Sequence, residues 1–347
     1  MSRRTRLNLT LPLTALALLA CGETTTPTQP EMAGNPAPAA LSLAAAANSW
    51  TARAPTPYSD FIYGYDLGMA PNSAGQSIVY AFGGTSSDDG GTGMRVKAYN
   101  VATNTWTGKL AQVGVFNSNG VGKIGSRLYF SGGYVNAGNL PDASRQLWAY
   151  DYSSDRMIPK ANLPIFSAEG VSGVINGKLY VLPGACNGNG YPNTGYCATE
   201  ATRRFYRYDP ATNTWVARRA APHFHRQGAA AVLDGKLYVT GGFGASGEGV
   251  SALDVYDPAT NTWHTLAPLP AGGAATSGAA LQGQFFVVVG GYNGTTPDNR
   301  AYAYNRVTNQ WKAKAAPQIF GSMTLVKLDG GPRLVTATGS HTLLYTP

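Results

Sequence analysis

The chain has 347 residues, including 43 glycines and 20 tyrosines, and only 13% of the residues are charged, against roughly 25% in typical soluble proteins. With 44% hydrophobic residues, this composition excludes intrinsic disorder for most of the chain and predicts a turn-rich, aromatic β-protein. The formal net charge is +8. Because the basic residues are spread along the chain, the charge gives no support to nucleic-acid binding.

The N-terminal segment has the features of a signal peptide. Arg3, Arg4 and Arg6 precede an apolar run over residues 7–20, which is too short to cross a bilayer core as a helix. The run ends in Leu-Leu-Ala before Cys21 and resembles the lipobox of bacterial lipoproteins. The resemblance implies that the mature chain begins at Cys21, with diacylglycerol on its thiol. The alternative is a soluble secreted protein in which Cys21 has no such role.

Residues 22–48 are rich in Thr, Pro and Ala, and this composition is typical of a flexible tether that spans roughly 30 Å. We therefore expect a signal peptide over residues 1–20, a lipidated cysteine and tether over 21–48, and a folded domain over 49–347. Loss of the three leader arginines leaves 23 basic and 18 acidic residues, a net charge of +5. We expect the protein in the bacterial cell envelope, facing the periplasm or the exterior, with the lipid anchor as its one membrane contact.

One pattern repeats along the folded domain. A tyrosine is followed seven residues later by a tryptophan, or once by methionine, and a two-residue motif that is usually Gly-Gly precedes each pair. The aromatic pairs are Tyr99–Trp106, Tyr150–Met157, Tyr208–Trp215, Tyr256–Trp263 and Tyr304–Trp311. The two-residue motifs are Gly83-Gly84, Gly132-Gly133, Pro183-Gly184, Gly241-Gly242, Gly290-Gly291 and a degenerate Thr338-Gly339. The length varies substantially only between each motif and the next tyrosine, so that connection is the variable one.

Each repeat predicts four short antiparallel strands. In the fourth repeat, residues 228–233 and 236–240 flank Asp234-Gly235, a dipeptide that favours a tight hairpin turn. Residues 252–256 and 262–266 flank a turn that contains Asp, Pro and Asn. A four-stranded unit repeated about every 50 residues, with a double glycine, a tyrosine and a tryptophan, resembles the kelch motif of β-propellers.

The two ends of the domain complete one repeat. The last repeat has three predicted strands and no tryptophan, whereas Trp50 resembles the end of a repeat whose beginning is missing. We therefore predict an all-β, six-bladed kelch-type β-propeller in which an N-terminal strand completes the C-terminal blade and closes the ring. The departures at Met157 and Pro183 predict less regular packing of those two blades.

The kelch resemblance implies that the variable connections open on the same face as the connections between blades, so we expect the ligand there. The longest connection, residues 185–202, holds Cys186 and Cys197. In an exported protein these two thiols predict a disulfide that either rigidifies a binding loop or is a structural staple. Candidate ligand contacts in this loop are Tyr191, Tyr196 and Glu200.

Arginines recur a few residues before the repeat tyrosine, at Arg95, Arg145, Arg203, Arg204 and Arg300. They form either a partial basic ring for a carboxylate or sulfate or structural contacts to loop carbonyls at the blade rims. The spacing does not separate the two interpretations, so Arg203 and Arg300 stay among the candidate ligand contacts.

Three connections between blades carry polar residues, which we place at the channel mouth by aligning Phe116, Phe166 and Phe224. The candidate ligand contacts there are Asn117, Asn119, Glu169, His225, Arg226 and Gln227. The sequence has four histidines and no cysteine to spare, so His223 and His225 indicate a hydrogen-bonded or solvated pair. We expect no metal site and no cofactor.

The favoured hypothesis is a monomeric, non-catalytic binding module that recognises a glycan or a protein through the variable-loop face. An alternative comes from the similarity to bacterial six-bladed kelch proteins that act as sialic acid mutarotases. That activity requires a carboxylate and an arginine in the central mouth, and the candidates are Glu169, Glu200, Arg203 and Arg226. A further alternative is a copper radical enzyme of the galactose-oxidase kind, whose Cys–Tyr cofactor a disulfide between Cys186 and Cys197 would preclude.

Overall fold

The computed structural model describes residues 46–57, 64–83, 94–135, 142–185, 203–273, 276–290, 299–319 and 324–347. They belong to one folded unit over residues 45–347, and the described part consists of β-strands and connections without an α-helix. It accordingly contains no helix that is long and apolar enough to cross a membrane.

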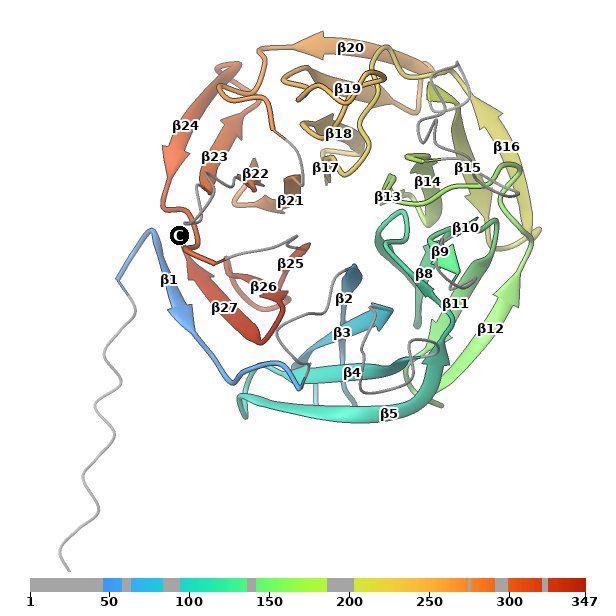
Figure 1. The fold of residues 1–347 in the computed structure, drawn as a ribbon, viewed down its shortest axis with the longest axis vertical. Helices are drawn as coiled ribbons and strands as arrows, with labels where there is room; N and C mark the ends of the chain where they lie inside the picture. The colour runs from blue at the N-terminus through green and yellow to red at the C-terminus, as the bar shows by residue number, and fades with distance from the viewer. Residues whose placement is uncertain are drawn as a thin grey trace, which may run out of the picture. The chain divides into compact units, whose positions relative to one another are not determined.

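Six four-stranded antiparallel sheets are arranged as blades around a centre (Figure 1). The first three blades are β2 (Tyr65–Pro71), β3 (Ser77–Gly83), β4 (Met94–Asn100) and β5 (Thr105–Val113); β7 (Val121–Ile124), β8 (Arg127–Ser131), β11 (Leu147–Asp151) and β12 (Arg156–Lys160); and β13 (Val171–Ile175), β14 (Lys178–Leu182), β15 (Phe205–Asp209) and β16 (Thr214–Arg218). The last three are β17 (Ala229–Leu233), β18 (Lys236–Thr240), β19 (Leu253–Asp257) and β20 (Thr262–Leu266); β21 (Thr276–Leu281), β22 (Gln284–Val289), β23 (Arg300–Asn305) and β24 (Gln310–Lys314); and β25 (Thr324–Lys327), β26 (Leu334–Thr338), β27 (His341–Thr346) and β1 (Ser49–Ala52). The predicted all-β, six-bladed propeller is confirmed.

The N-terminal strand β1 closes the ring by pairing with β27, with Trp50 opposite Tyr345. The Trp50 indole also donates to the carbonyl of Ala315 at 2.8 Å and lies 5.0 Å from the Tyr345 ring. The sixth blade therefore contains one strand from the start of the domain and three from its end, as the sequence predicted. This arrangement covers the edge that β27 would otherwise present for pairing with another chain.

A repeated side-chain clip joins neighbouring blades. In the fifth blade, Asn309 takes a left-handed backbone conformation (φ 55°), and its Oδ1 accepts hydrogen bonds from the Tyr304 hydroxyl at 2.7 Å and the Ala267 N–H at 3.0 Å. The Trp311 indole donates to the carbonyl of the same Ala267. The repeated tyrosine is fully buried in every blade. The equivalent Tyr–Asn pairs are Tyr99–Asn104, Tyr208–Asn213, Tyr256–Asn261 and Tyr345–Asn48.

The second blade keeps this clip with different residues. Asp155 stands where the other blades have asparagine and accepts hydrogen bonds from the Tyr150 hydroxyl at 2.9 Å and the Leu110 N–H at 2.6 Å. Met157, in place of tryptophan, has no indole N–H to donate. All four strands of this blade and of the third blade are present, so neither departure from the repeat removes a strand.

The cores lie between blades, where aromatic rings of one sheet pack on those of the next. Each such pair contributes about 0.5–1.5 kcal/mol beyond the burial of its surface. Examples are Phe82–Phe130 at 4.9 Å between centroids, Phe205–Tyr256 at 4.7 Å and Phe286–Tyr345 at 4.7 Å.

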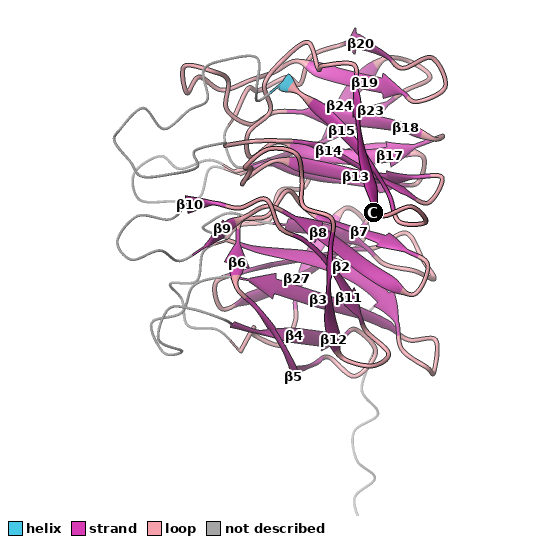
Figure 2. Cartoon of the chain, turned by 90° about the vertical axis from the view of Figure 1, so that its right-hand side faces the viewer, coloured by secondary structure: helices cyan, strands magenta, loops and turns pink. Residues whose placement is uncertain are grey.

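The innermost hairpins turn tightly at residues with positive φ, as the sequence predicted for Asp234-Gly235 (φ 49° and 73°). The pairs Asn176-Gly177 and Gln282-Gly283 have the same conformation, which is that of a type I′ turn. A small three-stranded sheet of β6 (Val115–Phe116), β9 (Tyr134–Val135) and β10 (Asp142–Ala143) lies at one face of the ring (Figure 2).

Candidate functional site

The connections that lead into the innermost strands form a chain of backbone hydrogen bonds from blade to blade. The N–H of Asn117 donates to Gly64 at 2.6 Å, that of Glu169 to Asn117 at 2.8 Å, that of Gln227 to Glu169 at 2.7 Å, and that of Thr276 to Gln227 at 2.9 Å. Gly64, Asn117, Glu169 and Gln227 all have positive φ. This shared left-handed conformation fixes three polar side chains in equivalent positions around the centre.

The double-glycine motifs allow these connections to approach. A Cβ on Gly242 would lie 2.4 Å from the carbonyl oxygen of Arg226, and one on Gly83 would lie 2.4 Å from that of Val115. Any other residue would push the connection away. The motif that identifies the repeat in the sequence is therefore also what positions the polar residues of the next segment.

A cavity of about 170 Å³ opens at the centre, where the six innermost strands begin. This volume lies below the usual range of ligand pockets and admits one sugar ring or one side chain. Its polar lining residues are Asp66, Asn117, Ser118, Glu169, Ser172, Gln227, Thr276, Ser277 and Thr324.

Glu169 is the most heavily bonded of these residues. Its carboxylate accepts hydrogen bonds from Arg226 Nη1 at 2.6 Å, Gln227 Nε2 at 2.6 Å and Asn117 Nδ2 at 3.3 Å. The Arg226 guanidinium also lies over the Phe243 ring, 4.7 Å from its centroid. The carboxylate is thus held in place and neutralised, and the structure brings together four of the residues that the sequence predicted.

Asp66 is a site residue that our sequence analysis missed. It lies in β2 and lines the same cavity, and it accepts hydrogen bonds from the N–H and the hydroxyl of Ser118 at 2.8 and 2.7 Å. Burial raises the pKa of this carboxyl, and the two bonds from Ser118 oppose the shift only in part. The signal for it was a lone carboxylate in the apolar run of the first innermost strand.

Asn119 is not part of the cavity, which corrects the prediction. It is fully buried, and its amide oxygen accepts from the Ser167 hydroxyl at 2.7 Å and the Gly170 N–H at 2.9 Å. These two bonds join the second blade to the third. Alignment on the phenylalanines placed Asn119 with Glu169, whereas the structure places Asn117 there.

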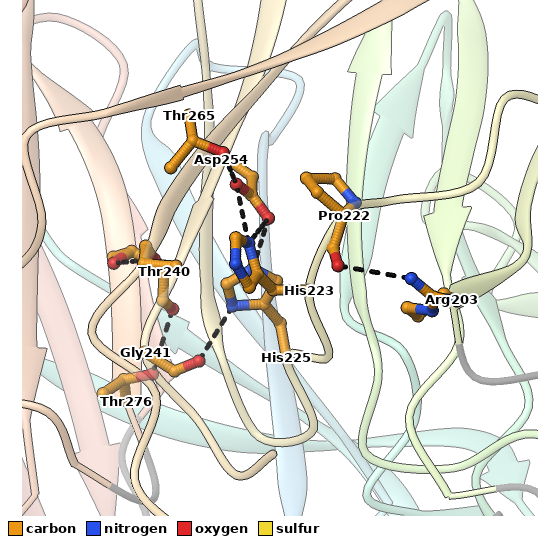
Figure 3. Close-up of polar contacts among 10 residues, drawn as sticks. Arg203, Pro222, His223, His225, Thr240, Gly241, Asp254, Thr265 and Thr276 are labelled. Atoms are coloured by element: carbon orange, nitrogen blue, oxygen red, sulfur yellow. Dashed lines mark hydrogen bonds and ion pairs between the residues drawn. The ribbon is translucent and has the colours of Figure 1, made fainter. Parts of the chain in front are cut away.

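His225 does not line the cavity either. It is 1% exposed, and its ring nitrogens lie 3.0 Å from the Gly241 carbonyl oxygen and 3.1 Å from Asp254 Oδ2 (Figure 3). A backbone carbonyl oxygen and a carboxylate oxygen thus hold the ring from both sides. The predicted role of His225 in ligand contact is therefore wrong, because the ring is enclosed.

Asp254, which is itself buried, is the common hydrogen-bond partner in a small polar cluster (Figure 3). His223 Nδ1 lies 2.9 Å from Oδ2, and the Thr265 hydroxyl donates to Oδ1 at 2.8 Å. Burial raises the pKa of Asp254, but the bonds from His225, Thr265 and His223 outweigh this effect and hold the pKa below its ordinary value. No group of three or more His, Cys, Asp or Glu residues in the described ranges is arranged to hold a metal ion.

The predicted arginines do not converge on the cavity. Arg145 Nε donates to the Leu163 carbonyl at 2.8 Å, and Arg203 Nη1 lies 3.5 Å from the Pro222 carbonyl oxygen. Arg300 is exposed at the start of β23. The contacts of Arg145 and Arg203 agree with the structural interpretation of the series. The predicted residues Cys21, Cys186, Tyr191, Tyr196, Cys197 and Glu200 lie outside the described residues.

Six four-stranded blades around a polar central mouth define a kelch-type β-propeller. The chain belongs to the family described as the KLHDC2/KLHL20/DRC7 Kelch-repeats domain, whose model matches residues 123–321.

Kelch-like protein 23 from Homo sapiens is 25% identical over 236 residues, which are 57% of this chain and 40% of the relative. The Mus musculus protein of the same name matches equally. The chain thus spans about two fifths of the length of these relatives. The solved structure of YjhT superposes with a TM-score of 0.63 at 16% identity, covering 83% of this chain and 94% of YjhT, and this similarity supports the fold alone.

Proposed function

We propose that the propeller is a binding module that recognises a glycan or a protein at the face where the central cavity opens. The observation that carries this proposal is the bonding of Asn117, Glu169 and Gln227. Their side chains line the cavity and are already held by one another, so a ligand meets fixed donors and acceptors at little cost in side-chain entropy.

The same bonding favours binding over catalysis. A general base needs a carboxylate oxygen free to take a proton from the substrate, whereas both oxygens of Glu169 already accept hydrogen bonds from protein groups. Kelch propellers commonly serve as protein-binding modules, and the relatives that match this chain carry kelch names. The small cavity fits one sugar ring of a glycan or one side chain of a protein partner.

The test is a glycan array and a pull-down from envelope extract with the variant Asn117→Gly/Gln227→Gly. Glycine keeps the positive φ, as at Gly64, and removes both side chains. The matched control is Asn176→Gly/Gln282→Gly, the same two residue types with positive φ at exposed hairpin turns. We expect the first variant to lose its ligand and the control to keep it; equal binding by both would refute the site.

A sugar mutarotase is the second candidate, and one observation favours it. Asp66, whose pKa burial raises, lines the central cavity, and a carboxyl with a raised pKa can act as a general acid or base. NMR exchange spectroscopy on the anomers of sialic acid and other acidic sugars tests this function. Unchanged exchange rates with the wild-type protein would exclude it, and Asp66→Asn should abolish any acceleration.

We further propose that a lipid on Cys21 tethers the module outside the cytoplasm. The support is the arginine-led apolar run that ends at this cysteine. Membrane fractionation of wild type and Cys21→Ser tests the anchor, and the variant should move to the soluble fraction. A Cys21→Ser protein that stays with the membrane would refute it. Mass spectrometry of the same preparation would test the disulfide between Cys186 and Cys197.

A further inference from the structure

A groove of about 490 Å³ lies at the outer rim between the third and fourth blades, separate from the central cavity. It is bounded by the two residues that precede β15, by the segment that follows β16 and by β20. Its lining residues are Arg203, Arg204, Arg219, Ala220, Ala221, Pro222, Trp263 and Thr265.

The fold does not require an arginine at position 219. The Arg219 backbone makes the inter-blade clip, donating its N–H to Asn261 and accepting the indole N–H of Trp263 at its carbonyl. At other blade junctions alanine makes the same two backbone contacts, at Ala161, Ala267 and Ala315. The Arg219 guanidinium is therefore not needed for the clip, and among these junctions only the one between the third and fourth blades has it.

The backbone contacts of the repeat do not require the groove's other two arginines, although Arg145 occupies the position of Arg203 in the second blade. Arg203 accepts the N–H of Ala221 at its carbonyl, and Ser251 accepts that of Leu269 in the same way. Arg203 and Arg204 thus correspond to Ser251 and Ala252 at the next junction, and neither side chain is needed for the backbone contact.

Smaller residues distinguish the same junction. Ala221 stands where Leu163 and Leu269 fill the equivalent positions with buried side chains, and the groove opens over it. Across from it, Asp254 lies two residues before the repeat tyrosine, where the third and fifth blades have Tyr206 and Tyr302. Replacement of bulky side chains by shorter ones leaves space that the other described junctions fill.

The charge of the groove is one-sided. In the described ranges, none of Arg203, Arg204 and Arg219 forms an ion pair with a carboxylate, and Arg204 and Arg219 are exposed. Asp254 lies nearby behind Thr265, but it is buried and bonded to His223 and His225. Three neighbouring guanidinium groups repel one another unless an anion lies among them.

We propose that this groove binds the carboxylate, sulfate or phosphate group of an acidic sugar. The exposed planar forks of Arg204 and Arg219 match such oxyanions. Arg203, whose Nη1 lies 3.5 Å from the Pro222 carbonyl oxygen, adds a third positive charge at the edge of the groove. The Trp263 indole and the Thr265 methyl group supply an apolar wall for the sugar ring, and the volume accommodates one or two rings. The site is independent of the central cavity, so either proposal can fail without the other.

The test is isothermal titration calorimetry of the folded domain with three probes: inorganic phosphate, a galacturonic acid trisaccharide and the neutral methyl ester of that trisaccharide. The groove variant is Arg203→Ser/Arg204→Ala/Arg219→Ala, which installs the residues of other junctions. The control is Lys312→Ala/Lys327→Ala/Arg333→Ala, which removes three exposed charges elsewhere. Melting temperatures verify that both variants fold.

We expect the acidic trisaccharide to bind wild type and the control variant with affinities within about twofold of each other. It should bind the groove variant at least about tenfold more weakly than it binds wild type, and the methyl ester should bind wild type more weakly by a similar factor. Equal weakening in both triple variants would show a general charge effect and overturn the site. Binding of phosphate without the trisaccharide would overturn the sugar assignment. Wild type that binds neither anionic probe would overturn the proposal entirely.

Discussion

Glu169 and Arg226 lead into two neighbouring blades and meet at the channel mouth, where Arg226 Nη1 donates to Glu169 Oε2 at 2.6 Å. The two side chains are 8% and 17% exposed. The pair therefore fixes the wall of the cavity and contributes to the packing of the third blade against the fourth.

Breaking this pair should cost stability. We expect Arg226→Met to destabilise the fold by about 2–3 kcal/mol, because it leaves Glu169 with a poorly compensated charge. The double variant Glu169→Gln/Arg226→Met should lose less than the sum of the two single variants. Urea denaturation of the four proteins measures this coupling; strictly additive losses would contradict it.

The inter-blade clip gives a second prediction. Asn309→Gly retains the positive φ but removes an acceptor shared by Tyr304 and Ala267, so we expect a loss of about 2–3 kcal/mol from two hydrogen bonds. Asn176→Gly has the same backbone conformation at a hairpin turn and serves as the control. A similar melting temperature for both variants would mean that the clip adds little.

The buried carboxyl of Asp66 predicts a pH effect. Its folded-state pKa is raised above 3.8, so wild type should lose stability as pH rises from 3.8 through that folded value. Asp66→Asn still offers an oxygen to Ser118 and carries no charge. We expect it to melt above wild type at pH 7 and to match wild type below pH 3.8; parallel melting curves from acid to neutral pH would count against this assignment.

The cluster around Asp254 predicts the opposite dependence. Its pKa is lowered below 3.8, so its contribution is present above that value and is lost as pH falls through the folded pKa. Asp254→Asn should destabilise the protein by about 2–4 kcal/mol at pH 7, and the difference should shrink in strong acid. Thermal melts of both proteins between pH 2 and 7 test this.

Closure of the ring can be tested at Trp50. Trp50→Ala removes its indole bond to Ala315 and its packing on Tyr345, and we expect a loss of about 2 kcal/mol for this half-buried ring. Removing β1 entirely should expose the edge of β27 and promote association. Light scattering measures the association state, and thermal melting the stability, of the full domain and of the chain that lacks β1. A truncated chain that stays monomeric and equally stable would argue against closure by β1.

The fold was predictable because the same hydrogen bonds between neighbouring blades recur around the ring, and the residues that make them recur in the sequence. The seven-residue offset from tyrosine to tryptophan encloses the turn that carries the clip asparagine, and Trp50 supplies the missing sixth copy. Glu169, Gln227 and Asn117 were also predictable as polar residues entering the innermost strands.

What could not be predicted depends on insertions and on distant partners. The segment between Asn117 and β7 has two more residues than the segments that follow Glu169 and Gln227. This difference places Asn119 in a blade junction, and the phenylalanine alignment did not show it. His225 and His223 bond to Asp254, which lies about 30 residues later in the sequence, in β19. Asp66 lies before Tyr99 and Trp106, the first aromatic pair of the repeat, so comparison of the repeats did not single it out.

The pairing of β1 with β27 also orders events in time. The Tyr345 hydroxyl bonds to Asn48, 297 residues earlier, so the seam forms only after nearly the whole domain has been synthesised. Ring closure therefore requires both ends of the domain, and any chain that stops before residue 343 lacks the partner of its own first strand.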